Sequence, residues 1–173
     1  NTILFVRNGR CQFAQLYLTS INNNFLKFRL TFDLLSTESN EDVLKRIEMG
    51  YRAVALKAAA KTLSMTLKMA KVAHENSLPC FLADLTCTPI LIDWNKNIAA
   101  RLAAFPGMKD MGLLESNGHQ NYVNWENLVN YCPYPNGSWI KSKDGLYHLD
   151  NDFYEKSGGI LKSSDHYLGL FNS

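Results

Sequence analysis

YRAVALKAAAKTLSMTLKMAKVAHENSLPCFLADLTCTPILIDWNKNIAARLA, residues 51–103, alternates short apolar runs with helical patterns. The apolar run at 53–56 ends abruptly in Lys57, and a second run at 80–83 ends in Asp84. Strand, helix, strand and helix in this order predict βα units of a parallel sheet with helices on its faces. Both charged residues then stand at carboxyl ends of strands, where such sheets place their sites.

The helical patterns in this stretch predict which side chains face the sheet. In the first helix we expect Leu63 and Leu67 on one apolar stripe and Met65 and Met69 on the next. We expect the second helix to span 89–104. Thr88 would be its N-cap, and Pro89 would occupy its first position.

Flanking segments extend this α/β pattern. Residues 3–6 form an expected strand, 11–21 a helix, 25–35 a half-buried strand, and 110–118 a further strand whose exit holds Glu115, Asn117 and His119. We divide the chain into parallel βα units at 1–131 and a loop-rich tail at 132–173. The tail contains an expected hairpin that turns at Asp144 and Gly145.

Composition places the chain in an ordinary class. Hydrophobic residues make up 46% and charged residues 20% of the 173 residues, and the net charge of +2 has no single-sign block behind it. We therefore expect neither nucleic acid nor a membrane as partner. The four cysteines, Cys11, Cys80, Cys87 and Cys132, lack metal-ligand spacing, and we interpret them as free thiols of a cytoplasmic protein.

Lys57 is the strongest catalytic candidate. An ammonium at the end of an apolar strand is partly desolvated, which favours the neutral amine, and such a lysine can act as general acid, general base or Schiff-base nucleophile. A lysine that extends from a strand end to solvent is an equally weighted alternative.

Weaker candidates follow other strands. Glu115 and Asn117 can orient a substrate amine or hydroxyl, although a plain polar turn explains the same residues. Asp84 is either a site acid or, as we favour, the cap of a turn into the next helix. Asp33 and Glu38, near the exit of the 25–35 strand, are candidate oxygen ligands for a divalent metal ion or, alternatively, caps of the next helix.

The stretch ESNEDVLKRIEMGYRAVALKAAAKTLSMTLKMAKVAHENSLPCFLADLT resembles the later barrel units of the enolase superfamily, of the mandelate racemase and muconate lactonizing enzyme type. ALKAAAKTLS is similar to the family pattern LKxAKxGGL, so Lys57 matches the catalytic base and Lys61 the second lysine, with Thr62 and Leu63 in place of two glycines. LLESNG matches the last strand, with Glu115 and Asn117 at the substrate-contacting positions.

The resemblance implies the C-terminal portion of a (β/α) TIM barrel. It implies a racemase, epimerase or dehydratase (an isomerase or lyase) that removes a proton alpha to a small carboxylate substrate, with Mg²⁺ stabilising the enolate. Lys57 would be the acid/base, and Asp33 or Glu38 would be the remaining metal ligands. Val6 stands where the first ligand aspartate belongs, and the second ligand pattern is missing.

From these departures we expect the chain to be incomplete or inactive alone. The alternative is a non-catalytic barrel fragment that acts through association. Its partner would be another copy, as a homo-oligomer, or the remainder of the same barrel, because a partial barrel leaves open sheet edges.

Overall fold

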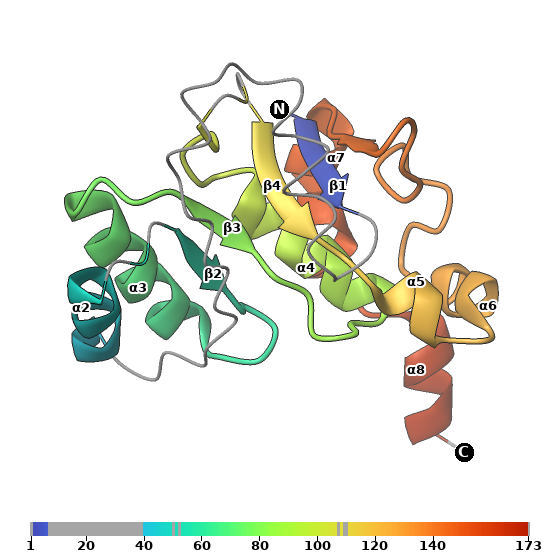
Figure 1. The fold of residues 1–173 in the computed structure, drawn as a ribbon. Helices are drawn as coiled ribbons and strands as arrows, with labels where there is room; N and C mark the ends of the chain where they lie inside the picture. The colour runs from blue at the N-terminus through green and yellow to red at the C-terminus, as the bar shows by residue number, and fades with distance from the viewer. Residues whose placement is uncertain are drawn as a thin grey trace.

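The computed structural model describes residues 2–6, 40–49, 51, 53–106, 108 and 111–172. The helix expected at 11–21, the strand expected at 25–35, and Asp33 and Glu38 lie outside these residues. The elements, most of them labelled in Figure 1, are β1 (Thr2–Val6), α2 (Asn40–Glu48), β2 (Val54–Leu56), α3 (Leu63–Glu75), β3 (Cys80–Leu82), α4 (Pro89–Ala99), β4 (Met111–Glu115), α5 (Gly118–Asn121), α6 (Trp125–Asn130), β5 (Leu146–His148), α7 (Asn151–Lys156), the 3₁₀ turn η2 (Ser157–Gly159) and α8 (Asp165–Phe171).

The five strands form one sheet in the order β2-β3-β4-β1-β5. β2, β3 and β4 are parallel neighbours in chain order, as the sequence predicts, and β1 lies parallel to β4 on the far side. β5 runs antiparallel to β1. The chain is thus a mixed α/β protein. Its described strands form an open sheet and do not close into a barrel (Figure 1).

Alternation along the strands separates the two faces of the sheet. Leu56, Leu82 and Leu114 belong to the apolar cluster that contains the buried residues of α3 and α4. At Gly112, which has the same parity as Leu114, an added Cβ would lie 2.3 Å from the carbonyl oxygen of Ala99, because α4 approaches the sheet there. The opposite face carries a smaller cluster: Phe81, Ala83, Phe105, Met108 and Leu113.

The residues that α3 buries differ in part from the predicted apolar stripes. Met69 is buried and Met65 packs against the core, as expected. Leu67, however, is 51% exposed and Leu63 is also exposed, so these two residues of the other predicted apolar stripe lie at the surface. Thr66 is buried instead, and its hydroxyl donates to the carbonyl oxygen of Thr62 at 3.1 Å. A buried polar side chain that makes its hydrogen bond within its own helix cannot be predicted from the spacing of apolar residues.

α4 is buried on nearly all sides, polar residues included. It begins at Pro89 with Thr88 as N-cap residue, as predicted, and ends at Ala99 instead of 104. Lys96 is only 2% exposed, and its Nζ lies 2.7 Å from Asp93 Oδ1 and 2.8 Å from the carbonyl oxygen of Trp139. The same Nζ lies 3.9 Å from the ring centroid of Tyr147. The ion pair lies within α4, and the Lys96 ammonium joins this helix to the C-terminal segment through Trp139 and Tyr147.

The segment 132–173 shares the main core. Trp139 and Phe153 are fully buried, and their ring centroids lie 5.5 Å apart. The chain turns at Asp144 and Gly145 as predicted: both have positive φ, and the amide of Leu146 donates to the carbonyl oxygen of Lys143, so the turn is of type I′.

The last helix, α8, extends away from the body of the molecule to the C-terminus (Figure 1). None of its residues is buried. Among the described residues, no helix is both long and apolar enough to span a membrane.

Candidate functional site

Three charged residues gather at the carboxyl edge of the parallel strands. Lys57 directly follows β2, Asp84 lies two residues after β3, and Glu115 is the last residue of β4. Burial raises the pKa of the Glu115 carboxyl, the charge of Asp84 raises this pKa further, and the charge of Lys57 lowers it. The charges of Asp84 and Lys57 thus both act on Glu115, and we call the three residues the edge cluster.

Strand alternation explains how the edge cluster is arranged. Glu115 shares the parity of Leu113, and Lys57 that of Ala55, so both belong to the face opposite α3 and α4. Asp84 has the parity of Leu82, which faces the helices, and it is only 5% exposed. Lys57 and Glu115 therefore lie on the face of the sheet opposite these helices, while Asp84 faces the loops.

Asp84 is the cap that the sequence analysis favours, and it serves two loops. Its Oδ1 accepts the backbone N–H of Cys87 at 2.6 Å. Its Oδ2 accepts the N–H groups of Asn117 at 2.8 Å and of Gly118 at 3.1 Å. A carboxylate with three such donors serves as a hydrogen-bond acceptor for the backbone.

Asn117 contributes a bond in the other direction. Its Oδ1 accepts the N–H of Thr86 at 3.1 Å, and Thr86 has a positive φ of 57°. The Tyr122 hydroxyl donates to the carbonyl oxygen of Thr86 at 3.0 Å. The amide oxygen of Asn117 therefore holds a strained loop residue, and its role toward a substrate remains a prediction.

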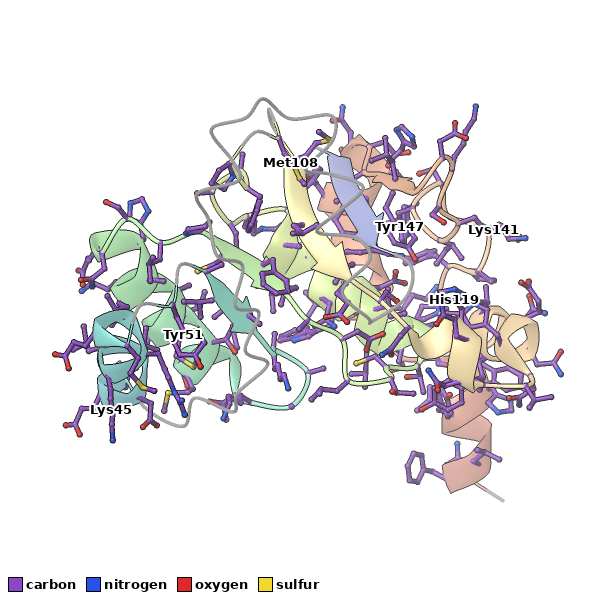
Figure 2. The ribbon with its side chains drawn as sticks, viewed as in Figure 1. Lys45, Tyr51, Met108, His119, Lys141 and Tyr147 are labelled. Atoms are coloured by element: carbon purple, nitrogen blue, oxygen red, sulfur yellow. The ribbon has the colours of Figure 1, made fainter. Side chains whose placement is uncertain are left out.

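His119 lies on α5, beyond the carboxyl end of β4, whereas Met108 lies near the other end of that strand (Figure 2). The His119 ring contacts Trp125 edge-on at a centroid distance of 6.2 Å. Between Glu115 and Asn117, Ser116 is buried, and its hydroxyl finds no hydrogen-bond partner in the described part of the chain. Buried polar atoms of this kind are uncommon.

The described residues bring no metal centre together. Among them, no group of three or more His, Cys, Asp or Glu side chains is close enough to hold an ion. At the edge, Asp84 already accepts three N–H groups and Glu115 has a raised pKa, so neither resembles a ready cation ligand. The Mg²⁺ expectation therefore depends on Asp33 and Glu38, which lie outside the described residues.

Sequence reasoning missed three residues at this edge: Thr86, Gly118 and Tyr122. Only Gly118 carries a signal in the sequence: it forms an Asn-Gly pair with Asn117, which is typical of a turn. Thr86 acts through its backbone N–H and carbonyl groups, and Tyr122 acts through its hydroxyl. Neither contribution is part of a recognisable sequence motif.

Comparison of the chain with protein-family models, with curated proteins and with solved structures finds no match.

Proposed function

We propose that this chain carries the acid/base site of an enzyme that removes a proton alpha to a carboxylate, as enolase-superfamily racemases, epimerases and dehydratases do. In this proposal β2, β3, β4 and their helices are part of a (β/α) barrel. The observation that supports it is the edge cluster: Lys57 and Glu115 share one face of the carboxyl edge, and the charge of Lys57 acts on Glu115.

Each residue has a role in this proposal. The amine of Lys57 takes the proton from the alpha carbon and returns a proton to the same position or to a leaving group. The carboxyl of Glu115, which stays protonated to a higher pH than usual, donates a hydrogen bond to the substrate carboxylate. Asn117 orients the substrate through its amide nitrogen.

Mg²⁺ belongs to the proposal only through the family resemblance. When bound, it would supply positive charge beside the oxygen that becomes negative, which is usually the largest contribution to such catalysis. Asp33 and Glu38 are its candidate ligands. Because one or two carboxylates leave Mg²⁺ largely to water, we expect weak binding by titration calorimetry.

Substrate binding is the first test, because it needs neither metal nor turnover. A panel of 2-hydroxycarboxylates is titrated while the NMR signals of the Lys57 and Glu115 side chains are followed. Lys57→Ala should weaken binding at least tenfold, whereas Lys68→Ala, an exposed lysine on α3, should not. Absence of binding by the wild type contradicts the proposal.

Proton exchange in deuterated water with Mg²⁺ is the second test. If the proton alpha to the carboxylate exchanges with the wild type and does not exchange with Lys57→Ala, the result supports the proposed enzyme activity. Binding without exchange supports the alternative, a non-catalytic barrel fragment that acts through association.

The alternative rests on the apolar surface of α8. Leu168, Leu170 and Phe171 are exposed, Phe171 to 87%, although apolar side chains on a short projecting helix are poorly stabilised without a partner. A mass that rises with concentration in sedimentation experiments, and falls in Leu170→Ser with Phe171→Ser, would favour this function. The free thiols of Cys80, Cys87 and Cys132 support the further proposal of a cytoplasmic location.

A further inference from the structure

One buried carboxylate joins the loop after β3 to the loop after β4. Asp84 belongs to the first loop and accepts the N–H of Cys87 within it. Through its other oxygen it accepts the N–H groups of Asn117 and Gly118, which belong to the second loop. Hydrogen bonds to a carboxylate acceptor are roughly twice as strong as neutral ones, so the two bonds from Asn117 and Gly118 link the loops firmly.

Residues after β4 also make hydrogen bonds to the backbone of the loop after β3. The Asn117 side chain accepts the N–H of Thr86, and the hydroxyl of Tyr122 donates to the carbonyl oxygen of the same residue. We call Asp84, Thr86, Asn117 and Tyr122 the edge clamp. Its bonds run in both directions, so neither loop can shift along the edge without breaking several of them.

The two loops are also in close steric contact inside the clamp. At Gly118 an added Cβ would lie 2.1 Å from the carbonyl oxygen of Cys87 and 3.0 Å from a ring carbon of Trp125. Only a residue without a side chain leaves room for this approach. The distance between the loops is therefore set by backbone contact as well as by hydrogen bonds.

The edge clamp lies beside the residues that the proposed function uses. Asn117 is a clamp member, and Glu115 precedes it by two positions on the same strand exit. The charged groups that act on Glu115 come from both neighbouring strand ends, Lys57 after β2 and Asp84 after β3. Asp84 therefore affects Glu115 in two ways, through the path of the backbone and through its negative charge.

We propose that Asp84 is a positioning residue of this site: its carboxylate, bonded to the backbone of both loops, sets where Glu115 and Asn117 lie relative to Lys57. This inference rests on the proposed function, because the groups that it positions are the ones assigned there to the substrate. A simple loop cap would hold the backbone alone and leave the titration of Glu115 unaffected.

The test is Asp84→Asn, which keeps the shape of the side chain, removes the charge and leaves one oxygen as acceptor. Amide hydrogen exchange is measured at Asn117 and Gly118, and the carboxyl carbon of Glu115 is titrated by NMR. We expect exchange at these amides to accelerate about tenfold or more, since a bond to a charged group is lost. We also expect the titration midpoint of Glu115 to fall toward that of an ordinary glutamate.

Asp150→Asn is the matched control. Asp150 also caps with its carboxylate, accepting the N–H of Phe153 at 2.9 Å at the start of α7. Asp150 follows β5 by two residues, and His148 at the end of β5 pairs with Thr2 at the start of β1. Glu115 pairs with Val6 at the other end of β1, so Asp150 lies toward the opposite end of the strands. The same chemical change there should leave the titration of Glu115 where it is in the wild type.

An unchanged Glu115 midpoint in folded Asp84→Asn overturns the proposal, whether or not the amides exchange faster. If Asp84→Asn does not fold, Asp84→Glu keeps the charge and moves the carboxylate outward by one methylene. It should keep the raised midpoint and lose the slow exchange of Asn117 and Gly118, and wild-type exchange in this variant overturns the proposal.

These readouts separate the inference from the proposed function. A lowered Glu115 midpoint in Asp84→Asn, with no carboxylate bound by the wild type, supports the role of Asp84 and contradicts the proposed function. A carboxylate that binds the wild type and Asp84→Asn equally well overturns the positioning role and leaves the proposed function standing.

Discussion

Gly118→Ala is the sharpest test of how the two edge loops pack. The new Cβ would lie 2.1 Å from the carbonyl oxygen of Cys87, which is backbone and cannot rotate away. Gly118 does not have a positive φ, so alanine is compatible with its backbone and the substitution tests space alone. To reach an ordinary contact of about 3.4 Å, the loops must separate by roughly 1.3 Å, which strains or breaks the bond from the Gly118 N–H to Asp84.

The expected loss of stability in Gly118→Ala combines the steric overlap with the weakened hydrogen bond to Asp84. Overpacking of a close contact costs ~1–3 kcal/mol, and losing a hydrogen bond to a charged group costs ~1.5–3 kcal/mol. We expect a decrease in the free energy of unfolding of about 3 kcal/mol. For a chain of this size that corresponds to a melting temperature lower by roughly 6–12 °C.

The assay is thermal and urea unfolding followed by circular dichroism, with Gly169→Ala as the matched control. Gly169 lies on α8, and nothing lies within 4 Å of its added Cβ. Alanine should be neutral there or stabilise by ~0.5–1 kcal/mol, as in other helices. Equal melting temperatures for Gly118→Ala and the wild type would refute the packing argument.

Three further predictions concern charge and packing. Lys96→Met should lower the free energy of unfolding by ~3–5 kcal/mol in urea titrations, because it leaves the buried carboxylate of Asp93 without its cation. Trp139→Ala should lower it by a similar ~3–5 kcal/mol, since the side chain is fully buried, whereas Phe171→Ala should change it by less than ~0.5 kcal/mol. The folded state favours protonated Glu115, so its contribution to stability is fully present below the ordinary carboxyl pKa and is lost as the pH rises through the raised value. Urea unfolding across this pH range should show that loss in the wild type and not in Glu115→Gln.

Each of these has a result that would contradict it. The double variant Lys96→Met with Asp93→Leu should recover most of the lost stability, and a double variant as unstable as the single one would mean that packing, not charge, is lost. A small effect of Trp139→Ala would mean that segment 132–173 is peripheral to the core. A Glu115→Gln profile parallel to that of the wild type would assign the pH dependence to other groups.

Local patterns predicted much of what the structure shows. The apolar runs before Lys57 and Asp84, the run that ends at Glu115, and the helix that starts at Pro89 are all present. Periodicity and helix-capping residues act over a few neighbouring positions, so a sequence contains them in full. The parallel order of β2, β3 and β4 follows from the same alternation.

Between residues 53 and 115 the sequence by itself determined the order of the strands and helices and the placement of Lys57 and Glu115 at strand ends, because both depend on local periodicity. It did not predict the helices α7 and α8 in the segment 132–173, which was expected to be rich in loops. Only the tertiary structure decided that β1 pairs with β4 and β5, that Lys96 is buried against Tyr147, and that Asp84 joins two loops. Each of these involves groups more than 30 positions apart in the chain. Whether a charged side chain is a solvated surface group or a buried hydrogen-bond partner depends on what the fold places beside it.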